Sequence, residues 1–199
     1  MYRNSVVYDD MRFLESGNMK ISYFFIRNDL STKYLIWLNN YTETINQVYA
    51  DMVHLAGGLQ INVIFFDYLG RGKSEGEFNN DTSYKSFKNI VKNISQITGK
   101  ISISHNDIIF CGKAYGCDTL KKYIKHHKYS KCIMIEPPRN YLSKKISTNK
   151  KIRLIFLKNN EQYCNYSNDK IGSKEYAVLL ENYQALVPYL QELVQPQNL

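Results

Sequence analysis

The chain has 199 residues, of which 44% are hydrophobic and 14% aromatic. This composition can bury a sizeable core, so it excludes a globally disordered chain and fits a single domain spanning residues 1–199. The formal net charge is +8, but lysine and arginine are scattered over the whole length, which argues against a dedicated nucleic-acid-binding face despite basic clusters at 121–131 and 144–153.

The first part of the chain alternates apolar segments with an amphipathic helix. Met19–Ile26 predicts a strand that pairs with the preceding segment Val6–Leu14. Apolar residues recur at helical spacing from Ile45 to Val53, and Gly57 and Gly58 are expected to end that helix. Two continuous apolar runs are typical of strands buried on both faces, namely Tyr34–Leu38 and Ile61–Phe66.

The alternation continues to the carboxyl terminus. Tyr84–Ile97 predicts an amphipathic helix with Asp81 or Thr82 as its cap and Gly99 just beyond its end. Four further strands are expected at Asp107–Cys111, Lys131–Ile135, Ile152–Leu157 and Tyr176–Leu180, and two further helices at Cys117–His127 and Tyr183–Val194.

This order of elements predicts the fold class. Strands that alternate with helices require crossover connections, which give a mainly parallel sheet covered on both faces, that is, a three-layer α/β sandwich. The first two strands are joined closely and should form an antiparallel edge at the N-terminal side of the sheet.

Two glycine motifs stand directly after predicted strands. The segment from Asp67 to Ser74 reads D-x-x-G-x-G-x-S, and the segment from Gly112 to Gly116 reads G-x-x-x-G between a strand and a helix. Together they resemble the α/β-hydrolase superfamily, in which G-x-S-x-G forms a sharp turn that projects a nucleophilic serine. In that resemblance Ser74 has a structural role, and the short segments between the later strands imply a compact member without a cap domain.

The resemblance also implies positions for the catalytic residues. The nucleophile position is Ala114, which has no hydroxyl group. The acid position after the strand Ile152–Leu157 falls on Glu161, with Asp169 as a weaker candidate. No histidine follows His127 in the chain, so the base position before the last helix has no histidine.

The oxyanion hole of the family uses two backbone N–H groups. The first would belong to Tyr115, directly after the nucleophile position. The second would come from the loop that begins Asn39-Asn40, where the family commonly has His-Gly. Since these donors are backbone groups, the resemblance implies an oxyanion hole that does not depend on side-chain identity, whereas the loop here lacks the family's glycine.

Three functions are consistent with these residues. The first is a protein of α/β-hydrolase fold without a working triad, a pseudoenzyme that binds a small acyl-type ligand or a protein partner at the former cleft. The second is a serine esterase or thioesterase whose nucleophile has been replaced by alanine or that uses a non-standard base. The third is a basic scaffold that binds an anionic macromolecule through its lysines.

No metal or cofactor is expected. The four cysteines show neither C-x-x-C nor zinc-ligand spacing, and packing explains Cys111 and Cys117 better than catalysis does. The adjacent His126 and His127 also lack the spacing of a helical metal site. No apolar run is long enough to span a bilayer, and acids stand where a signal peptide would be apolar, so we expect a cytoplasmic protein.

Overall fold

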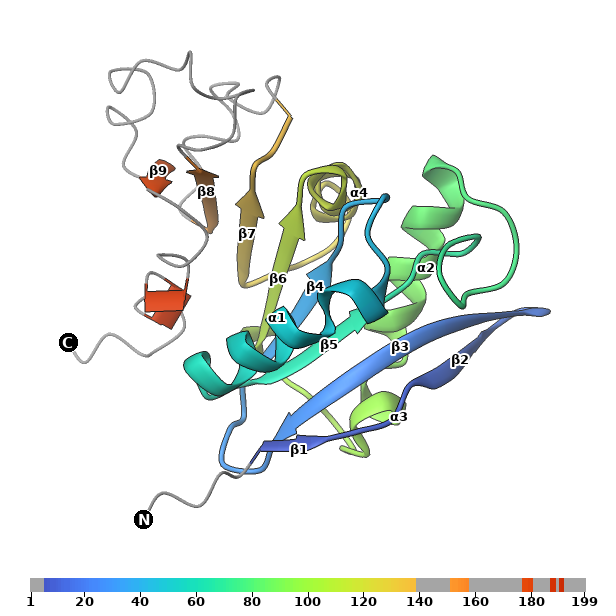
Figure 1. Cartoon of the computed structure of the whole chain (residues 1–199), viewed down its shortest axis with the longest axis horizontal. Coiled ribbons are helices and arrows are strands. Elements are labelled where there is room, and N and C mark those ends of the chain that lie inside the picture. The colour runs from blue at the N-terminus through green and yellow to red at the C-terminus, as the bar shows by residue number, and fades with distance from the viewer. Residues whose placement is uncertain (1–5, 139–150, 158–176, 181–186, 189, 192–199) are drawn as a thin grey trace.

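The structure is a computed structural model that describes residues 6–138, 151–157, 177–180, 187–188 and 190–191. Within these ranges nine strands form one sheet in the order β1-β3-β5-β4-β6-β7-β8-β9, and β2 pairs with β3 outside that path (Figure 1). The strands are β1 (Val6–Tyr8), β2 (Arg12–Ser16), β3 (Met19–Asn28), β4 (Tyr34–Leu38), β5 (Asn62–Phe66), β6 (Ile108–Lys113), β7 (Lys131–Ile135), β8 (Ile152–Leu157) and β9 (Ala177–Leu180).

The sheet is mainly parallel. All pairings from β5 through β4, β6, β7 and β8 to β9 are parallel, whereas β3 runs antiparallel to β1, β2 and β5. The predicted parallel sheet with an antiparallel N-terminal edge is therefore confirmed. The helices are α1 (Ile45–Leu59), α2 (Asn80–Lys92), α3 (Ile94–Thr98) and α4 (Tyr115–Ile124), with a short 3-10 turn, η1, at His105–Asp107.

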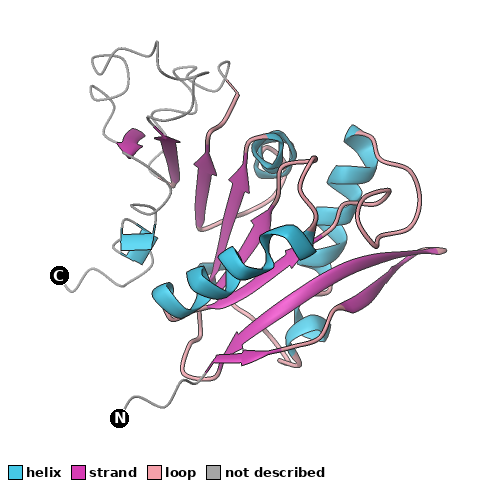
Figure 2. Ribbon diagram, in the orientation of Figure 1, coloured by secondary structure: helices cyan, strands magenta, loops and turns pink. Residues whose placement is uncertain are grey.

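Helices cover both faces of this sheet (Figure 2). Strand β4 shows how one apolar run serves two cores, because successive side chains of a strand point to opposite faces. Leu35 and Trp37 lie in the core under α1, whereas Ile36 and Leu38 lie in the core under α2 and α4. All five residues of β4 are buried, so the predicted three-layer arrangement is also confirmed.

The first helix runs past the glycines that were expected to end it. Gly57 and Gly58 lie inside α1, which ends at Leu59 and is capped by Gln60 in the left-handed conformation (φ 54°). A β-carbon at Gly58 would come within 2.6 Å of the Val187 side chain. Gly58 therefore allows α1 to pack closely against Val187, a contact between distant parts of the sequence that a pattern of helix ends cannot indicate.

The single helix predicted at Tyr84–Ile97 is instead two helices, α2 and α3, which meet at Asn93. The Asn93 backbone has φ −103° and ψ 19°, outside the helical range, and its side-chain amide donates to the Asn89 carbonyl at 2.8 Å. This local hydrogen bond competes with helix continuation, as asparagine side chains commonly do. Gly99 caps α3 in the left-handed conformation, at the predicted position.

The cap of α2 also differs from the prediction. Asn79 is the cap residue, and its Oδ1 accepts hydrogen bonds from the N–H groups of Asp81 and Thr82, both at 2.9 Å. The hydroxyl group of Thr82 in turn accepts from the Asn79 N–H at 2.8 Å. The two residues proposed as caps therefore lie in the first turn of the helix, inside a capping box.

Of the predicted final helix, residues 187–188 and 190–191 are helical, and the rest of that segment lies outside the described residues. Among the helices that the structure describes, none is long and apolar enough to cross a membrane.

Candidate functional site

The central feature of the site is the turn between β6 and α4, which we call the elbow (Gly112–Gly116). Ala114 stands at its tip with φ 48° and ψ −111°, a conformation that residues with a β-carbon rarely adopt. Two backbone hydrogen bonds hold it there: the Ala114 N–H donates to the Ile135 carbonyl at 2.9 Å, and the Ala114 carbonyl accepts from the Cys117 N–H at 3.0 Å. Strain of this kind persists only where the surrounding structure fixes it.

Both glycines of the elbow are required by close backbone contacts. A β-carbon at Gly112 would lie 2.8 Å from the carbonyl carbon of Gly116. A β-carbon at Gly116 would lie only 2.3 Å from the Leu38 carbonyl oxygen, at the end of the neighbouring strand β4. The G-x-x-x-G spacing therefore reflects two positions at which the turn leaves no room for a side chain.

The first glycine motif, from Asp67 to Ser74, forms a buried hydrogen-bond network at the same edge of the sheet. Asp67 is 2% exposed, and its carboxylate accepts hydrogen bonds from the N–H groups of Ile45 and Lys73 and from the Ser22 hydroxyl, at 2.9 to 3.1 Å. Burial raises the pKa of Asp67, and these three hydrogen bonds lower it in part. The carboxylate therefore ties the start of α1 to the end of β5 and to β3.

The rest of that motif completes the support. The Ser74 hydroxyl donates to the Asp67 carbonyl at 2.8 Å and accepts from the Ser22 N–H at 2.9 Å. Gly72 has φ 54°, and a β-carbon there would lie 2.0 Å from the Asp67 carboxylate. Ser74 thus makes structural hydrogen bonds, in line with the role that the family resemblance implied for it.

The loop from 39 to 44 lies against the elbow, because Gly116 contacts the backbone of Leu38 and Asn39. The carbonyl group of Asn39 accepts from the Tyr68 hydroxyl at 3.0 Å. Its side chain is buried, and neither its amide nitrogen nor its oxygen has a hydrogen-bond partner within the described part of the chain. The structure therefore places the Asn39 loop beside the elbow, while the oxyanion role of the Tyr115 and Asn39 N–H groups stays a prediction.

The loop from 39 to 44 also contains a carboxylate, that of Glu43. The Asn40 N–H donates to Glu43 Oε2 at 3.3 Å, and Glu43 Oε1 accepts from Lys113 Nζ at 2.5 Å. Lys113 directly precedes Ala114, and both partners of this ion pair are about three-quarters buried. One N–H of the loop is thus already bound to a negatively charged group.

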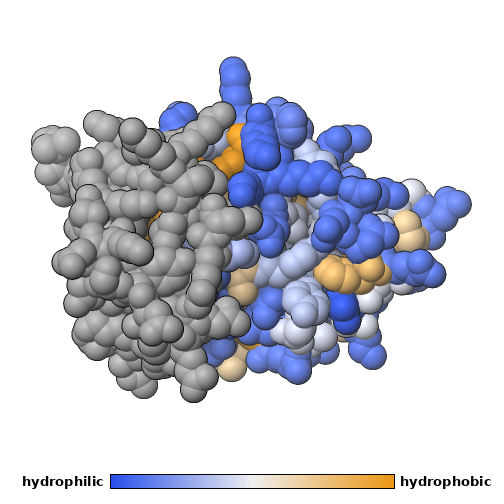
Figure 3. All heavy atoms as spheres, turned by 90° about the horizontal axis from the view of Figure 1, so that it is seen from above, coloured by the Kyte–Doolittle hydropathy of each residue, from blue (hydrophilic) through white to orange (hydrophobic). Residues whose placement is uncertain are grey.

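Three aromatic side chains and one arginine gather beside the elbow, and we call them the aromatic group: Tyr41, Phe78, Tyr115 and Arg71. The Tyr115 ring lies 5.4 Å from the Tyr41 ring and 5.5 Å from the Phe78 ring, and the Arg71 guanidinium lies over Phe78 at 4.5 Å. Arg71 Nε is buried without a hydrogen-bond partner among the described residues. Figure 3 looks onto this edge of the sheet, and the part of the face formed by described residues is mainly hydrophilic with isolated apolar patches.

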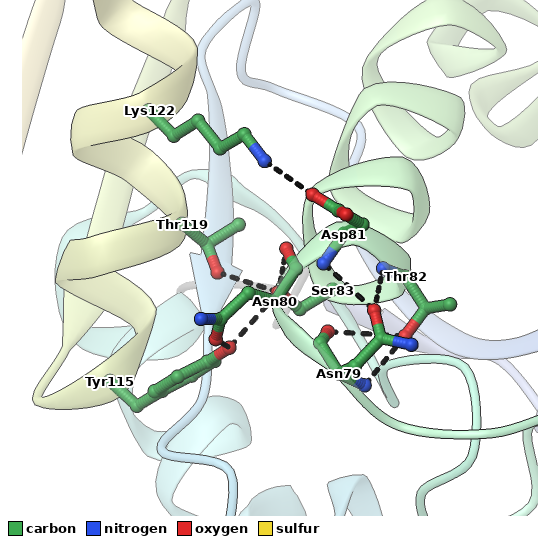
Figure 4. Close-up of polar contacts among 8 residues, drawn as sticks. All are labelled: Asn79, Asn80, Asp81, Thr82, Ser83, Tyr115, Thr119 and Lys122. Carbon is green, nitrogen blue, oxygen red and sulfur yellow. Dashed lines mark hydrogen bonds and ion pairs between the residues drawn. The ribbon is translucent and has the colours of Figure 1, made fainter.

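The Tyr115 hydroxyl fixes this group to α2. It donates to Asn80 Oδ1 at 2.6 Å and lies 3.2 Å from the Ser83 hydroxyl, which also accepts from Thr119 at 3.4 Å (Figure 4). The helix that follows the elbow is therefore joined to the start of α2 by side-chain hydrogen bonds. These bonds orient the Tyr115 ring beside the tip of the turn.

The two predicted acid positions, Glu161 and Asp169, lie outside the described residues. His54 is exposed on α1, while His105 precedes β6 and His127 precedes β7, so both lie at the opposite edge of the sheet from the elbow. Cys111 and Cys117 flank the tip but are fully buried, and burial raises the pKa of both thiols well above the ordinary value.

Similar solved structures decide which fold this is. An esterase from Pyrococcus furiosus superposes with a TM-score of 0.68 at 16% identity, over 96% of this chain and 91% of the esterase. This chain has the α/β-hydrolase fold. An α/β serine hydrolase homologue from Coxiella burnetii (TM-score 0.66, 13% identity, 95% and 97% coverage) and a lidless α/β serine hydrolase from Xanthomonas campestris (0.64, 14%, 98% and 94%) agree. Neither a protein-family model nor a curated protein sequence matches the chain.

Sequence reasoning about the α/β-hydrolase fold missed several residues at this edge. Glu136 follows β7, directly beside the elbow strand, and has a left-handed backbone (φ 51°) held by its N–H bond to the Ile155 carbonyl at 2.8 Å. Its place directly after an apolar run was a usable signal, because carboxyl ends of adjacent parallel strands meet at one edge. Tyr41, Phe78 and Arg71 gave no such signal, since Tyr41 comes from the loop after β4 and the other two come from the loop after β5. No cluster of potential metal ligands occurs among the described residues.

Proposed function

We propose that this chain is a non-catalytic protein of α/β-hydrolase fold, which binds a small acyl-type ligand at the elbow edge of the sheet. The observation that carries the proposal is the methyl group at the tip of the turn. A triad enzyme needs a nucleophile at this position and a base that activates it, and the sequence offers neither a serine at 114 nor a histidine after 127.

The charge beside the elbow supports the same conclusion. Acyl transfer passes through an oxyanion that is stabilised by hydrogen-bond donors aimed at it. Here Glu43 accepts from the Asn40 N–H in the loop that would supply such a donor, and also pairs with Lys113. The Asn40 N–H is therefore already bound to an acceptor, so the loop suits a ligand group placed elsewhere better than the oxyanion of a tetrahedral intermediate.

The aromatic group suggests what kind of ligand fits. Tyr41, Phe78 and Tyr115 offer ring faces to an apolar chain, and Arg71 offers a guanidinium that matches a carboxylate in a bidentate manner. We therefore infer a short carboxylic acid or acyl conjugate as the ligand class. Octanoate is a suitable probe, with binding followed by calorimetry.

Arg71→Gln should weaken octanoate binding about tenfold or more, because a charge-assisted hydrogen bond contributes roughly 1.5–3 kcal/mol. Lys73→Gln is the matched control, since Lys73 is exposed in the same loop and should leave the affinity within a factor of two. Unchanged octanoate affinity in Arg71→Gln would show that the Arg71 guanidinium does not contact the ligand. If the parent showed no saturable octanoate binding, this ligand class would be rejected.

The catalytic part of the proposal is tested by restoring the serine. Ala114→Ser should show no turnover of an activated short-chain ester and no labelling by a fluorophosphonate, because no histidine follows to accept the serine proton. Loss of triad members leaves at most about 10³–10⁴-fold over water from the oxyanion hole and binding. The parent protein, in which nothing can be labelled at position 114, is the control.

The second candidate is an acyl hydrolase of the esterase or thioesterase class whose serine has been replaced. The strained backbone at Ala114, with φ 48° and ψ −111°, favours it, because that conformation is the one that presents a nucleophile. Stoichiometric labelling and rapid turnover by Ala114→Ser would move this candidate to first place, with Glu136 as a group to be tested for a role in activating the serine.

A further inference from the structure

Two aliphatic side chains protrude from the amino edge of the sheet, that is, the edge at which the parallel strands begin. Leu30, in the turn before β4, is 82% exposed, and Ile101, in the loop before β6, is fully exposed. They are two of the four large apolar side chains that are exposed among the described residues. The ion pair between Lys33 and Asp107, at 2.6 Å, joins their two segments, which lie along the lower border of Figure 1.

The loop that carries Ile101 is fixed at both ends. Gly99 caps α3 in the left-handed conformation (φ 68°), and Ile103 packs against the core under α2 and α4. Between these two points Lys100, Ile101 and Ser102 are all exposed. The aliphatic side chain is therefore held at the tip of a short loop, so presenting it to a partner costs little conformational entropy.

Lysines surround these two side chains. Lys92 is the last residue of α2, and Lys125 caps the end of α4. Lys128 lines a pocket together with His105 and Asn106, which directly precede β6. We call the following exposed residues the amino-edge lysines: Lys92, Lys100, Lys125 and Lys128. Among the described residues, no acidic group lies within ion-pair distance of any of them.

The acids at this edge are already paired. The loops that precede β4, β5, β6 and β7 contain only two acids, of which Asp29 pairs with Arg27 at 2.9 Å and Asp107 with Lys33. The described loops at the opposite edge contain more acids, namely Glu43, Asp67, Glu75, Glu77 and Glu136. The amino edge therefore has an excess of positive charge and attracts an anionic surface.

The combination of aliphatic and basic side chains indicates which anionic surface fits. A single-stranded nucleic acid is usually bound by aromatic rings on which its bases stack, whereas Leu30 and Ile101 have no ring. At the surface of an anionic bilayer, lysines bind the headgroups and aliphatic side chains enter the boundary of the acyl chains. Both kinds of side chain at this edge thus have a counterpart in a lipid surface.

We propose that the amino edge is a peripheral membrane-binding surface. Leu30 and Ile101 insert at the acyl-chain boundary, and the amino-edge lysines bind acidic lipid headgroups. Since β6 has six residues and ends at the elbow, roughly 20 Å separates this surface from the elbow. The elbow therefore faces away from the bilayer, and the proposal is independent of the function proposed for the elbow.

Co-sedimentation with lipid vesicles tests the proposal. The parent should bind vesicles of about three parts phosphatidylcholine to one part phosphatidylserine, and should bind vesicles of phosphatidylcholine alone at least about tenfold more weakly. Added salt should weaken the binding, because it screens the lysines. If the parent did not sediment with the phosphatidylserine vesicles at low salt, the proposal would be overturned.

Two double variants separate the apolar from the electrostatic contribution. Leu30→Ser/Ile101→Ser should weaken binding to the phosphatidylserine vesicles at least about tenfold, because it removes two aliphatic side chains that become buried. Lys100→Gln/Lys128→Gln should also weaken it at least about tenfold, since each lysine near such a surface contributes about fivefold. Thermal melting should show that both variants are folded.

The matched controls lie away from the amino edge. Phe13→Ser removes an exposed ring from β2, which pairs with the opposite end of β3. Lys20→Gln/Lys73→Gln removes two exposed lysines near the carboxyl edge. Both should bind the vesicles within a factor of two of the parent. An equal loss in the controls, or parent-like binding by the Leu30 and Ile101 double variant, would contradict the proposal.

A fluorescence measurement tests insertion directly. Trp37, the chain's only tryptophan, is buried, so Ile101→Trp adds a reporter at the loop tip. Its emission should shift to shorter wavelength when phosphatidylserine vesicles are added, whereas the emission of Phe13→Trp should stay unchanged. An unshifted emission of bound Ile101→Trp would exclude insertion. An oligothymidylate that bound the parent more tightly and released it from the vesicles would overturn the proposal in favour of a nucleic acid.

Discussion

A β-carbon is tolerated at position 114 of the elbow, whereas position 116 has no space for one. Gly116→Ala would place a methyl group 2.3 Å from the Leu38 carbonyl oxygen, so either α4 or β4 must shift. We expect a loss of about 3 kcal/mol in the free energy of unfolding, at the upper end for overpacked sites. Denaturant titration measures it.

Gly57→Ala is the control for this substitution. Gly57 lies inside α1, and a β-carbon there would meet nothing within 4 Å. Since alanine has the higher helix propensity, this variant should be more stable than the parent by about 0.5–1 kcal/mol. If Gly116→Ala proved as stable as Gly57→Ala, Gly116 and the Leu38 carbonyl group would not be in the close contact described here.

Some residues of the site could be predicted from local sequence spacing, and others could not. The two elbow glycines and Ala114 stand within one short motif, so local spacing was sufficient to place them at a turn. Arg71 and Phe78 share the loop after β5, and Arg71 meets Tyr41 only because the loop after β4 converges with that loop at one edge of the sheet. Contacts between loops depend on tertiary structure, and no periodicity in the sequence encodes them.

At the scale of elements, Asp67 joins β5, β3 and α1 through one buried carboxylate. Asp67→Ala would leave the N–H groups of Ile45 and Lys73 and the Ser22 hydroxyl without their acceptor. Because each unsatisfied buried donor costs about 1–3 kcal/mol, we expect a loss of about 3 kcal/mol or more. Asp51→Ala, at an exposed site on α1, is the control and should change stability by less than about 0.5 kcal/mol.

The same carboxyl group predicts a pH dependence. The pKa of Asp67 is raised from 3.8 in the folded protein, so the folded state binds this proton more tightly than the unfolded state does. The contribution to stability is therefore complete below pH 3.8 and falls as the pH rises through the folded-state pKa. As the pH rises from 3.8 through the folded-state pKa, the difference in the free energy of unfolding between the parent and Asp67→Ala should therefore decrease. A difference that increased with pH would contradict the raised pKa.

Elements of strong periodicity were predictable, and their ends were less so. The strands Tyr34–Leu38, Lys131–Ile135 and Ile152–Leu157 have the predicted bounds, because strands that are largely buried on both faces are marked by almost continuous apolar runs. The break at Asn93 was not predicted, since apolar residues continue at helical spacing through α2 and α3 and the break depends on one side-chain hydrogen bond. The cap of α2 was misplaced for the same reason, because it depends on the side-chain hydrogen bonds of Asn79, whereas the cap at Gly99 was predicted correctly.

At the scale of the molecule, the two ends of the parallel strands have different character. The elbow end combines aromatic rings with the Lys113–Glu43 pair, whereas the other end gathers lysines and histidines around a pocket. Parallel strands cause this segregation, because all their carboxyl ends meet at one edge and all their amino ends at the other. Lysines that are distant in the sequence, such as Lys128 and Lys151, therefore line one pocket only after folding.

The buried thiols report on the stability of the whole sheet. Cys111, Cys117 and Cys132 are fully buried, and burial raises the pKa of all three well above the ordinary value. Since only an exposed thiolate reacts with a disulfide reagent, the variant Cys164→Ser should show no fast-reacting thiol under native conditions. All three thiols should react at once in guanidinium, and at intermediate concentrations their reaction rate should follow global unfolding. A thiol that reacted quickly in the folded variant would show that Cys111, Cys117 or Cys132 is accessible, and one flanking Ala114 would then be a candidate nucleophile.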